Sequence, residues 1–189
     1  MKIGIYIGSF DPVHKGHIRL ARHLLKKNYV DHLLIVPTGN YWDKQDLTPI
    51  EERIGMLKIF ETEDLEIETE CNDLPYTYQL LRKLKERYPE DELYLILGAD
   101  NLLHFEDWQN AREIMEYPWI ILKRKGIDIP ENMERLKKTD YIIVEDAKEY
   151  DISSSYIREN MDDYEKVKDL VHKKVYQRYK KILQNRSQS

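Results

Sequence analysis

The chain is poor in cysteine, glycine and proline. Cys71 is the only cysteine among 189 residues, which excludes an intrachain disulfide framework and a multi-cysteine zinc site and leaves an inert thiol. Seven glycines and seven prolines exclude fibrous and low-complexity classes. No apolar run approaches the ~20 residues that cross a bilayer, and Met1 is followed by a strand-like run instead of a signal peptide. We therefore expect a cytoplasmic protein with no membrane partner.

The chain also lacks a strong charge of one sign. It has 30 Lys+Arg and 35 Asp+Glu, a net charge of −5, which argues against nucleic acid as a partner held by phosphate neutralisation. With 41% hydrophobic residues the chain can bury one core, so we expect a single domain over 1–189. Its Tyr-rich C-terminal segment, helical over about 153–184, fits either a cover for the sheet or a homo-oligomer interface.

Short apolar runs alternate with helical patterns along the chain. The Thr-Pro-Ile-Glu sequence that begins at Thr48 predicts a capping box with proline at the first helical position. The alternation predicts an α/β fold: a Rossmann-like open, mostly parallel sheet with helices on both faces. The predicted strands cover 2–7, 32–36, 65–68, 93–97, 119–122 and 141–144, and the predicted helices cover 18–27, 49–61, 76–88, 109–116 and the segment from 153 on.

Ligands of such sheets bind at the carboxyl ends of the strands, and a polar cluster follows the first predicted strand. It reads GSFDPVHKGH. Gly8 and Gly16 let the backbone approach a ligand, and His14 and His17, three residues apart, can both donate to one phosphate if the turn is helical. An Asp-Pro turn with two surface histidines is the plainer alternative. A zinc pair with Asp11 is a weaker one.

Two further polar clusters follow later segments of the pattern. Asp100 comes directly after the strand predicted at 93–97, where a carboxylate can accept from ribose hydroxyls; a helix N-cap is the alternative. Serines 153–155 open the C-terminal segment and can cap a helix, and Arg158 lies one turn further on, within reach of the same anion. Serine capping alone would also explain the third cluster.

Together these clusters resemble a known family. GSFDPVHKGH resembles the G-[ST]-F-D-P-x-H-x-G-H signature of the nucleotidyltransferase superfamily, and the ISSSYIR sequence over 152–158 resembles its I-S-S-T-x-I-R partner. Leu-Gly-Ala-Asp-Asn-Leu-Leu over 97–103, with Trp108 and Glu113 after it, resembles the G-A-D-x-L…W…E-[IL] segment of bacterial nicotinate mononucleotide adenylyltransferases. The resemblance spans residues 2 to about 160.

The resemblance implies transfer of AMP from ATP to nicotinate mononucleotide, with release of pyrophosphate and with Mg²⁺ accompanying the ATP. Such a reaction needs charge neutralisation and positioning more than a covalent nucleophile. The family motifs place four residues in catalysis, namely His14, His17, Lys44 and Arg158. They place the following at ATP: Gly8, Ser9, Phe10, His14, His17, Gly98, Asp100, Ile152, Ser153, Ser154, Ser155 and Arg158.

The resemblance also implies a mononucleotide site. Tyr76 and Thr77 match a family segment that approaches the pyridine carboxylate, and Trp108 would stack on the pyridine ring, although both aromatics fit core or rim positions equally. Arg53 falls where the family has an arginine in the helix after the lysine loop. The residues implied for the mononucleotide are Ser9, Lys44, Tyr76, Thr77, Trp108 and Arg124.

Three departures from the family pattern concern specificity. Ile7 replaces a glycine, Trp42 and Asp43 replace Pro-His before Lys44, and Pro75 replaces a serine. They leave open a preference for nicotinate, for nicotinamide, or for both. A pantetheine-phosphate adenylyltransferase is disfavoured because it usually carries threonine in place of the first histidine. A cytidylyltransferase is disfavoured because the R-T-x-G-[IV]-S-T type motif near the end of such domains is not present here. A non-catalytic nucleotide sensor is the alternative from another class.

Overall fold

The centre of the molecule is one parallel sheet. A computed structural model describes residues 1–40, 46–129, 138–150 and 152–188. The strands follow the order β3-β2-β1-β4-β5-β6, and every pairing between them is parallel. This confirms the predicted fold class and places the reversal of strand order between β1 and β4. The strands are β1 (Lys2–Gly8), β2 (His32–Pro37), β3 (Leu65–Ile67), β4 (Glu92–Gly98), β5 (Trp119–Leu122) and β6 (Tyr141–Val144).

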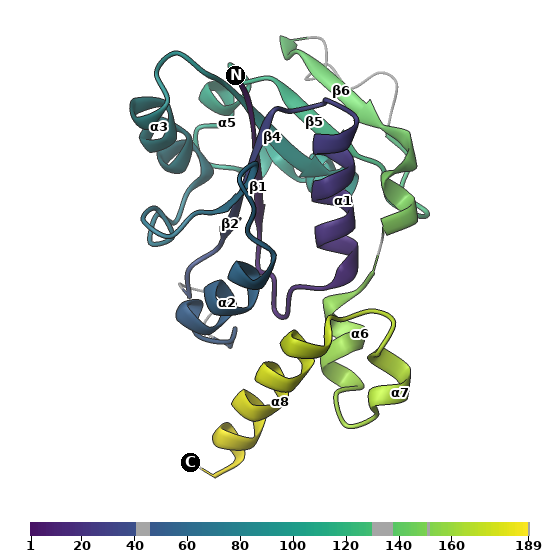
Figure 1. Ribbon diagram of the computed structural model, residues 1–189. Coiled ribbons are helices and arrows are strands. Elements are labelled where there is room, and N and C mark those ends of the chain that lie inside the picture. Colours follow the sequence, from purple (N-terminus) through teal and green to yellow (C-terminus); the bar gives the residue numbers. More distant parts are fainter. Residues whose placement is uncertain (41–45, 130–137, 151, 189) are drawn as a thin grey trace.

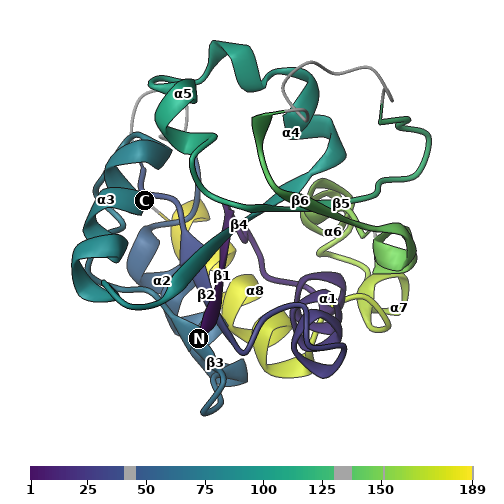
Figure 2. The same ribbon diagram turned by 90° about the horizontal axis from the view of Figure 1, so that it is seen from above.

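Helices cover both faces of the sheet, as predicted (Figure 2). Side chains of one helical group pack into one core cluster, and side chains of the other group pack into a second cluster across the sheet. The first group comprises α1 (Lys15–Lys26), α2 (Ile50–Leu57), α6 (Ser154–Glu159), α7 (Tyr164–Val167) and α8 (Lys173–Ser187). The second comprises α3 (Thr77–Arg87), α4 (Ala99–Leu103), the 3₁₀ turn η3 (Phe105–Asp107) and α5 (Ala111–Ile114).

The central strands are apolar throughout because both of their faces are buried. In β1, Ile3 and Ile5 belong to the cluster under α3, whereas Tyr6 belongs to the cluster under α1. In β4, Leu95 belongs to the cluster under α3 and Ile96 to the cluster under α1. The period-two alternation of a strand therefore fills two cores, as in parallel sheets covered by helices.

The predicted capping box before α2 is wrong. Pro49 holds the N-cap position, and no side chain caps the helix. The backbone of Thr48 is used elsewhere: its N–H donates to Oδ2 of Asp11 at 2.9 Å, and its carbonyl accepts from Nε of Arg53 at 2.7 Å. These tertiary bonds fix the backbone of Thr48 and replace the local cap.

The C-terminal segment lies beyond the carboxyl end of β1, below the sheet in Figure 1. The continuous helical pattern expected from residue 153 is divided into three helices, α6, α7 and α8. Tyr176 and Tyr179 of α8 are buried in the same core cluster as α1, so this helix covers the fold, which is one of the two expected roles. In the part of the chain that the structure describes, no helix is both long and apolar enough to cross a membrane.

Candidate active site

The turn between β1 and α1 is shaped by Phe10. This residue has φ of 48°, in the left-handed region that favours glycine, yet its side chain is 2% exposed. Its ring packs edge-on against Tyr6, with centroids 5.4 Å apart, and against His17, with centroids 4.8 Å apart. The side chain of Phe10 thus serves the core, and a ligand contact at this position falls to its backbone.

His14 and His17 cap the start of α1 for each other. The backbone N–H of His17 donates to Nδ1 of His14, and the backbone N–H of His14 donates to Nδ1 of His17, each at 3.2 Å. The two rings are stacked, with centroids 3.5 Å apart and planes 11° apart. The two rings lie side by side, but His14 is the extended N-cap residue outside the helix, so the expected sharing of one helical face is not what brings them together; we call this arrangement the reciprocal histidine cap.

The reciprocal histidine cap fixes the tautomer that either ring adopts when it is neutral. Each Nδ1 uses its lone pair to accept a backbone N–H, so a neutral ring carries its proton on Nε2. Burial, together with the positive charges of His14 and Arg124, lowers the pKa of His17 well below its ordinary value. His17 is therefore neutral near pH 7 and presents an Nε2–H donor, which suits stabilisation of an anion without proton transfer.

The C-terminal motif packs against the first motif. Nη1 of Arg158 donates to the carbonyl of Asp11 at 2.7 Å, and Oγ of Ser154 donates to the carbonyl of Pro12 at 3.2 Å. Nη2 of Arg158 also donates to Oγ of Ser155 at 3.0 Å. Oγ of Ser153 accepts from the N–H of Tyr156, which confirms the predicted serine cap. Two motifs far apart in the sequence thus form one polar surface at the carboxyl end of β1.

Gly16 has a different role from the expected one. A side chain at this position would collide with the carbonyl oxygen of Tyr150, in the 3₁₀ segment η5 (Glu145–Tyr150). The space beside Gly16 is therefore filled by the backbone of η5, and the prediction that it admits a ligand is wrong. Glycine is needed here because η5 must pass close to α1 on its way to the C-terminal motif.

Asp100 and Arg124 face each other at the ends of two adjacent strands. Nε of Arg124 lies 3.5 Å from Oδ1 of Asp100, and the Asp100 side chain is half exposed. Gly98 holds the N-cap position of α4, so Asp100 lies in the first turn and the alternative that it caps the helix is wrong. Because Arg124 also contributes to the lowered pKa of His17, this pair lies on the histidine side of the site.

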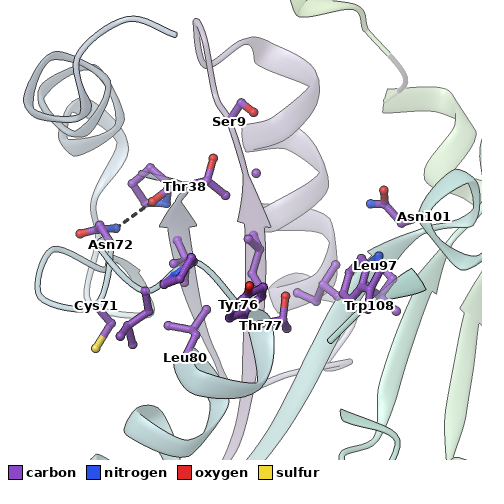
Figure 3. Close-up of a pocket in the computed structure, with 17 residues that line it drawn as sticks. Ser9, Thr38, Cys71, Asn72, Tyr76, Thr77, Leu80, Leu97, Asn101 and Trp108 are labelled. Carbon is purple, nitrogen blue, oxygen red and sulfur yellow. Dashed lines mark hydrogen bonds between the residues drawn. The ribbon is translucent and has the colours of Figure 1, made fainter. Parts of the chain in front are cut away.

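A cavity of about 310 Å³ lies between the ends of the central strands and the start of α3. Four of the residues predicted for the mononucleotide line it: Ser9, Tyr76, Thr77 and Trp108 (Figure 3). Lys44 lies outside the described residues, and Arg124 is not among the lining residues. The structure therefore brings together most of the predicted acceptor side and leaves Arg124 with Asp100.

Trp108 is both a cavity residue and a core residue. Its side chain lines the cavity and is partly buried, and its ring packs on Phe105 with centroids 5.2 Å apart. Ile7 and Pro75, two of the departures from the family pattern, also line the cavity. Trp42 and Asp43 lie outside the described residues. The departures that the structure describes thus concern the acceptor cavity directly.

Some cavity residues were missed from the sequence. Thr38, Asn72 and Asn101 line the cavity beside the predicted residues, with Thr38 and Asn101 on opposite sides of the space in Figure 3. Nδ2 of Asn72 donates to the carbonyl of Pro37 at 2.9 Å, which ties the loop before α3 to the end of β2. The available signal was position: Thr38 and Asn101 follow the ends of predicted strands, where ligands of parallel sheets bind.

A buried carboxylate, paired with a partly exposed arginine, supports this loop. Glu68 is 1% exposed and accepts from Nη1 of Arg87 at 2.5 Å and from the N–H groups of Glu70 and Cys71 at 2.7 and 3.0 Å. Burial and the charge of Glu68 raise the pKa of the Cys71 thiol. A protonated, buried thiol agrees with the inert role expected for Cys71.

The polar groups of the site are donors rather than metal ligands. Across residues 1–40, 46–129, 138–150 and 152–188, no group of three or more His, Cys, Asp or Glu side chains is arranged to hold a metal ion. His14 and His17 commit their Nδ1 atoms to backbone N–H groups, which weakens the alternative of a zinc pair through these atoms. Imidazole N–H, guanidinium and hydroxyl groups at one surface suit phosphate.

A parallel sheet with this surface and an adjoining cavity at its carboxyl edge defines a nucleotide-binding protein of the Rossmann-like α/β class. A cytidylyltransferase-like family model matches residues 5–160. A probable nicotinate-nucleotide adenylyltransferase of Endomicrobium trichonymphae is 36% identical over 93% of this chain and 94% of its own. A relative of the same name from Flavobacterium johnsoniae is 34% identical over 94% of this chain and 95% of its own.

Solved structures share the fold. The nicotinic acid mononucleotide adenylyltransferase of Plasmodium falciparum, complexed with NaAD, superposes with a TM-score of 0.79 at 23% identity, over 95% of each chain. The chain belongs to the cytidylyltransferase-like family and, with its curated relatives, to the nicotinate-nucleotide adenylyltransferases. The resemblance drawn from the two motifs is thereby confirmed.

Proposed function

We propose that this protein transfers AMP from ATP to nicotinate mononucleotide and releases pyrophosphate. The observation that carries the proposal is the contact of the C-terminal motif with the first motif, through Arg158 and Ser154, beside a cavity lined by Trp108 and Thr77. One surface offers donors to an anion and the adjoining space can hold a ring. The family membership and the curated relatives support the same assignment.

In the proposed reaction, a phosphate oxygen of the mononucleotide attacks the α-phosphorus of ATP. A new phosphorus–oxygen bond forms, and the bond from the α-phosphorus to the oxygen that bridges to the β-phosphorus breaks, so that pyrophosphate leaves with the electron pair. Nε2–H of His17 donates to the α-phosphate as its charge develops, and His14 donates beside it. Neither histidine needs to exchange a proton.

The remaining polar residues hold ATP. Arg158 and the serines 153–155 contact the β- and γ-phosphates, and the Arg158 guanidinium is already oriented by the carbonyl of Asp11. Asp100, half exposed at the start of α4, accepts from the ribose. The backbone of the remaining ATP-binding residues completes this half of the site: Gly8, Ser9, Phe10, Gly98 and Ile152.

The mononucleotide occupies the cavity. Trp108 stacks on the pyridine ring, Tyr76 and Thr77 approach its carboxylate, and Ser9 lies between the two substrates. Arg124 adds positive charge from the side of Asp100, and Lys44 neutralises phosphate charge during transfer. Mg²⁺ enters as part of the MgATP substrate, because the donors on the protein suit phosphate oxygens and Mg²⁺ prefers oxygen ligands such as those of the phosphates themselves.

Pyrophosphate release tests the proposal. Purified protein with MgATP is supplied separately with nicotinate mononucleotide, nicotinamide mononucleotide and phosphopantetheine at equal concentration. Turnover with the nicotinate compound supports the proposal, and comparable turnover with the nicotinamide compound shows that Ile7 and Pro75 relax the choice. Activity with phosphopantetheine alone refutes the pyridine site. No release with any acceptor favours a nucleotide sensor.

A further inference from the structure

Arg53 is an arginine buried inside the fold. It lies on α2, between the apolar residues Ile50 and Leu57, and it is 0% exposed. A guanidinium stays charged at every physiological pH, so its removal from water must be offset by hydrogen bonds from the protein. The position of these bonds shows what the buried charge holds in place.

The hydrogen bonds of Arg53 reach three separate backbone segments. Nη1 donates to the carbonyl of Ser9 at 2.8 Å, and Nη2 donates to the carbonyl of Thr38 at 2.6 Å. Nε donates to the carbonyl of Thr48 at 2.7 Å, and Nη2 also donates to Oδ1 of Asn40 at 3.0 Å. The planar guanidinium presents donors in several directions and so reaches all of these acceptors. The single ammonium group of a lysine could not reach them all.

Two of these segments form walls of the acceptor cavity. Ser9 follows β1 and Thr38 follows β2, and both residues line the cavity. The parallel pairing of the two strands ends at Gly8 and Pro37, after which the N–H of Thr38 still donates to the carbonyl of Gly8 at 2.9 Å. Beyond this point the guanidinium of Arg53 joins the two segments that follow β1 and β2.

We propose that Arg53 is a positioning residue that sets the spacing of Ser9 and Thr38 in the cavity and thereby the affinity for the mononucleotide. The inference rests on the proposed function of the cavity. Arg53 itself does not line the cavity, so it acts through the carbonyls that it holds. Ser9 also belongs to the residues proposed for ATP, whereas Thr38 and Thr48 do not, so we expect Arg53 to affect the mononucleotide more than ATP.

The test compares Michaelis constants for the two substrates in Arg53→Met and Arg53→Lys. We expect Arg53→Met to raise KM for nicotinate mononucleotide by about tenfold or more, with an increase for ATP at least fivefold smaller. Arg53→Lys should give an intermediate KM, because the ammonium keeps the charge and some of the bonds. A general loss of stability would lower the amount of active enzyme without separating the two constants.

Arg178→Met is the matched control. Arg178 of α8 donates to Oε2 of Glu52 at 2.9 Å and packs on Gly55, so it supports the same helix without lining the cavity. This variant should keep both Michaelis constants within about twofold of the wild type. A rise in KM for the mononucleotide equal to that of Arg53→Met would overturn the proposal, because any weakening of α2 would then suffice.

Asn40→Ala keeps the proposal testable if Arg53→Met does not fold. It removes one acceptor of Arg53 at an exposed position, together with the bonds from the Asn40 amide to the carbonyls of Leu47 and Thr48, and we expect KM for the mononucleotide to rise about threefold. Unchanged Michaelis constants in folded Arg53→Met, or in both Arg53→Lys and Asn40→Ala, would overturn the positioning role of Arg53 and leave the proposed function standing. A wild type that uses neither pyridine mononucleotide overturns the proposed function, and the Arg53 proposal with it.

Discussion

The reciprocal histidine cap makes His17→Ala an informative substitution, because His17 contributes to stability and to catalysis through different atoms. Its Nδ1 accepts the N–H of His14 at 3.2 Å and so helps to cap α1. Its Nε2–H is the donor that we assign to the α-phosphate. Alanine removes both contributions, and their sizes can be estimated separately.

The two effects differ enough to be distinguished. Loss of a capping interaction costs about 1 kcal/mol of folding free energy. A domain with a free energy of unfolding of about 5 kcal/mol or more would keep about 4 kcal/mol, which leaves roughly one molecule in a thousand unfolded. Loss of one preorganised donor to a developing anion costs about 3 kcal/mol of transition-state stabilisation, or ~10² in turnover. We therefore expect turnover to fall at least ~10²-fold in a protein that remains folded.

The assay measures kcat for pyrophosphate release at saturating MgATP and nicotinate mononucleotide, with ATP affinity by calorimetry and folding by urea denaturation. ATP affinity should change much less than turnover. His14→Asn is the companion variant, because asparagine is a favoured N-cap but lacks the imidazole: stability should be retained while turnover falls. Turnover of His17→Ala within threefold of the wild type, or a loss explained by unfolding, would remove His17 from the mechanism.

Four other measurements probe the rest of the site. Trp108→Ala should mainly raise KM for the mononucleotide; unfolding instead would show that its contact with Phe105 is its main role. Arg158→Ala should weaken ATP binding in calorimetry, and wild-type affinity would dismiss the phosphate contact. Arg87→Met should lower the free energy of unfolding in urea by about 1–3 kcal/mol, because the buried Glu68 loses its charged partner and keeps only its two backbone donors; a loss below about 0.5 kcal/mol would contradict a stabilising role of Arg87. The pKa of His17 is lowered in the folded protein, so below about pH 6.5 the unfolded chain binds a proton that the folded chain does not. The free energy of unfolding should therefore fall with decreasing pH, by at most ~1.4 kcal/mol per pH unit from this group. The fall should be shallower in His17→Ala, and equal slopes would contradict the lowered pKa.

Periodicity was sufficient to predict the sheet, the strand ends indicated the three polar clusters, and the resemblance to the family added the residues expected for the mononucleotide. Apolar runs such as 93–97 became central strands because two helical layers bury both of their faces. The serine cap at Ser153 depends on local geometry, so the local sequence predicted it. The three-residue spacing of His14 and His17 does bring the two rings together, but through a cap in which His14 precedes the helix. The cap at Thr48 failed because its backbone N–H is held by Asp11, a residue far away in the sequence, and such a contact leaves no trace in the local sequence.

Arg53 did leave a signal. Ile50, Ile54 and Leu57 form the apolar stripe of α2, and Arg53 lies on that stripe, three residues after Ile50 and four before Leu57. A cation in an apolar stripe must find several acceptors at the buried face, and helix α2 packs beside the strand ends where free carbonyls are concentrated. The pattern therefore pointed to a buried arginine beneath the site, whereas the identity of its acceptors required the structure.

The position of the C-terminal motif adds a constraint on how the site forms. Gly16 must stay small for η5 to pass, and Arg158 and Ser154, which follow η5 in the sequence, contact the first motif. The side chains proposed for the outer ATP phosphates are thus held by contacts between the two ends of the domain. Any change that loosens η5 from α1, such as a side chain at Gly16, should weaken ATP binding without touching a phosphate contact, because Arg158 would lose the carbonyl that orients it.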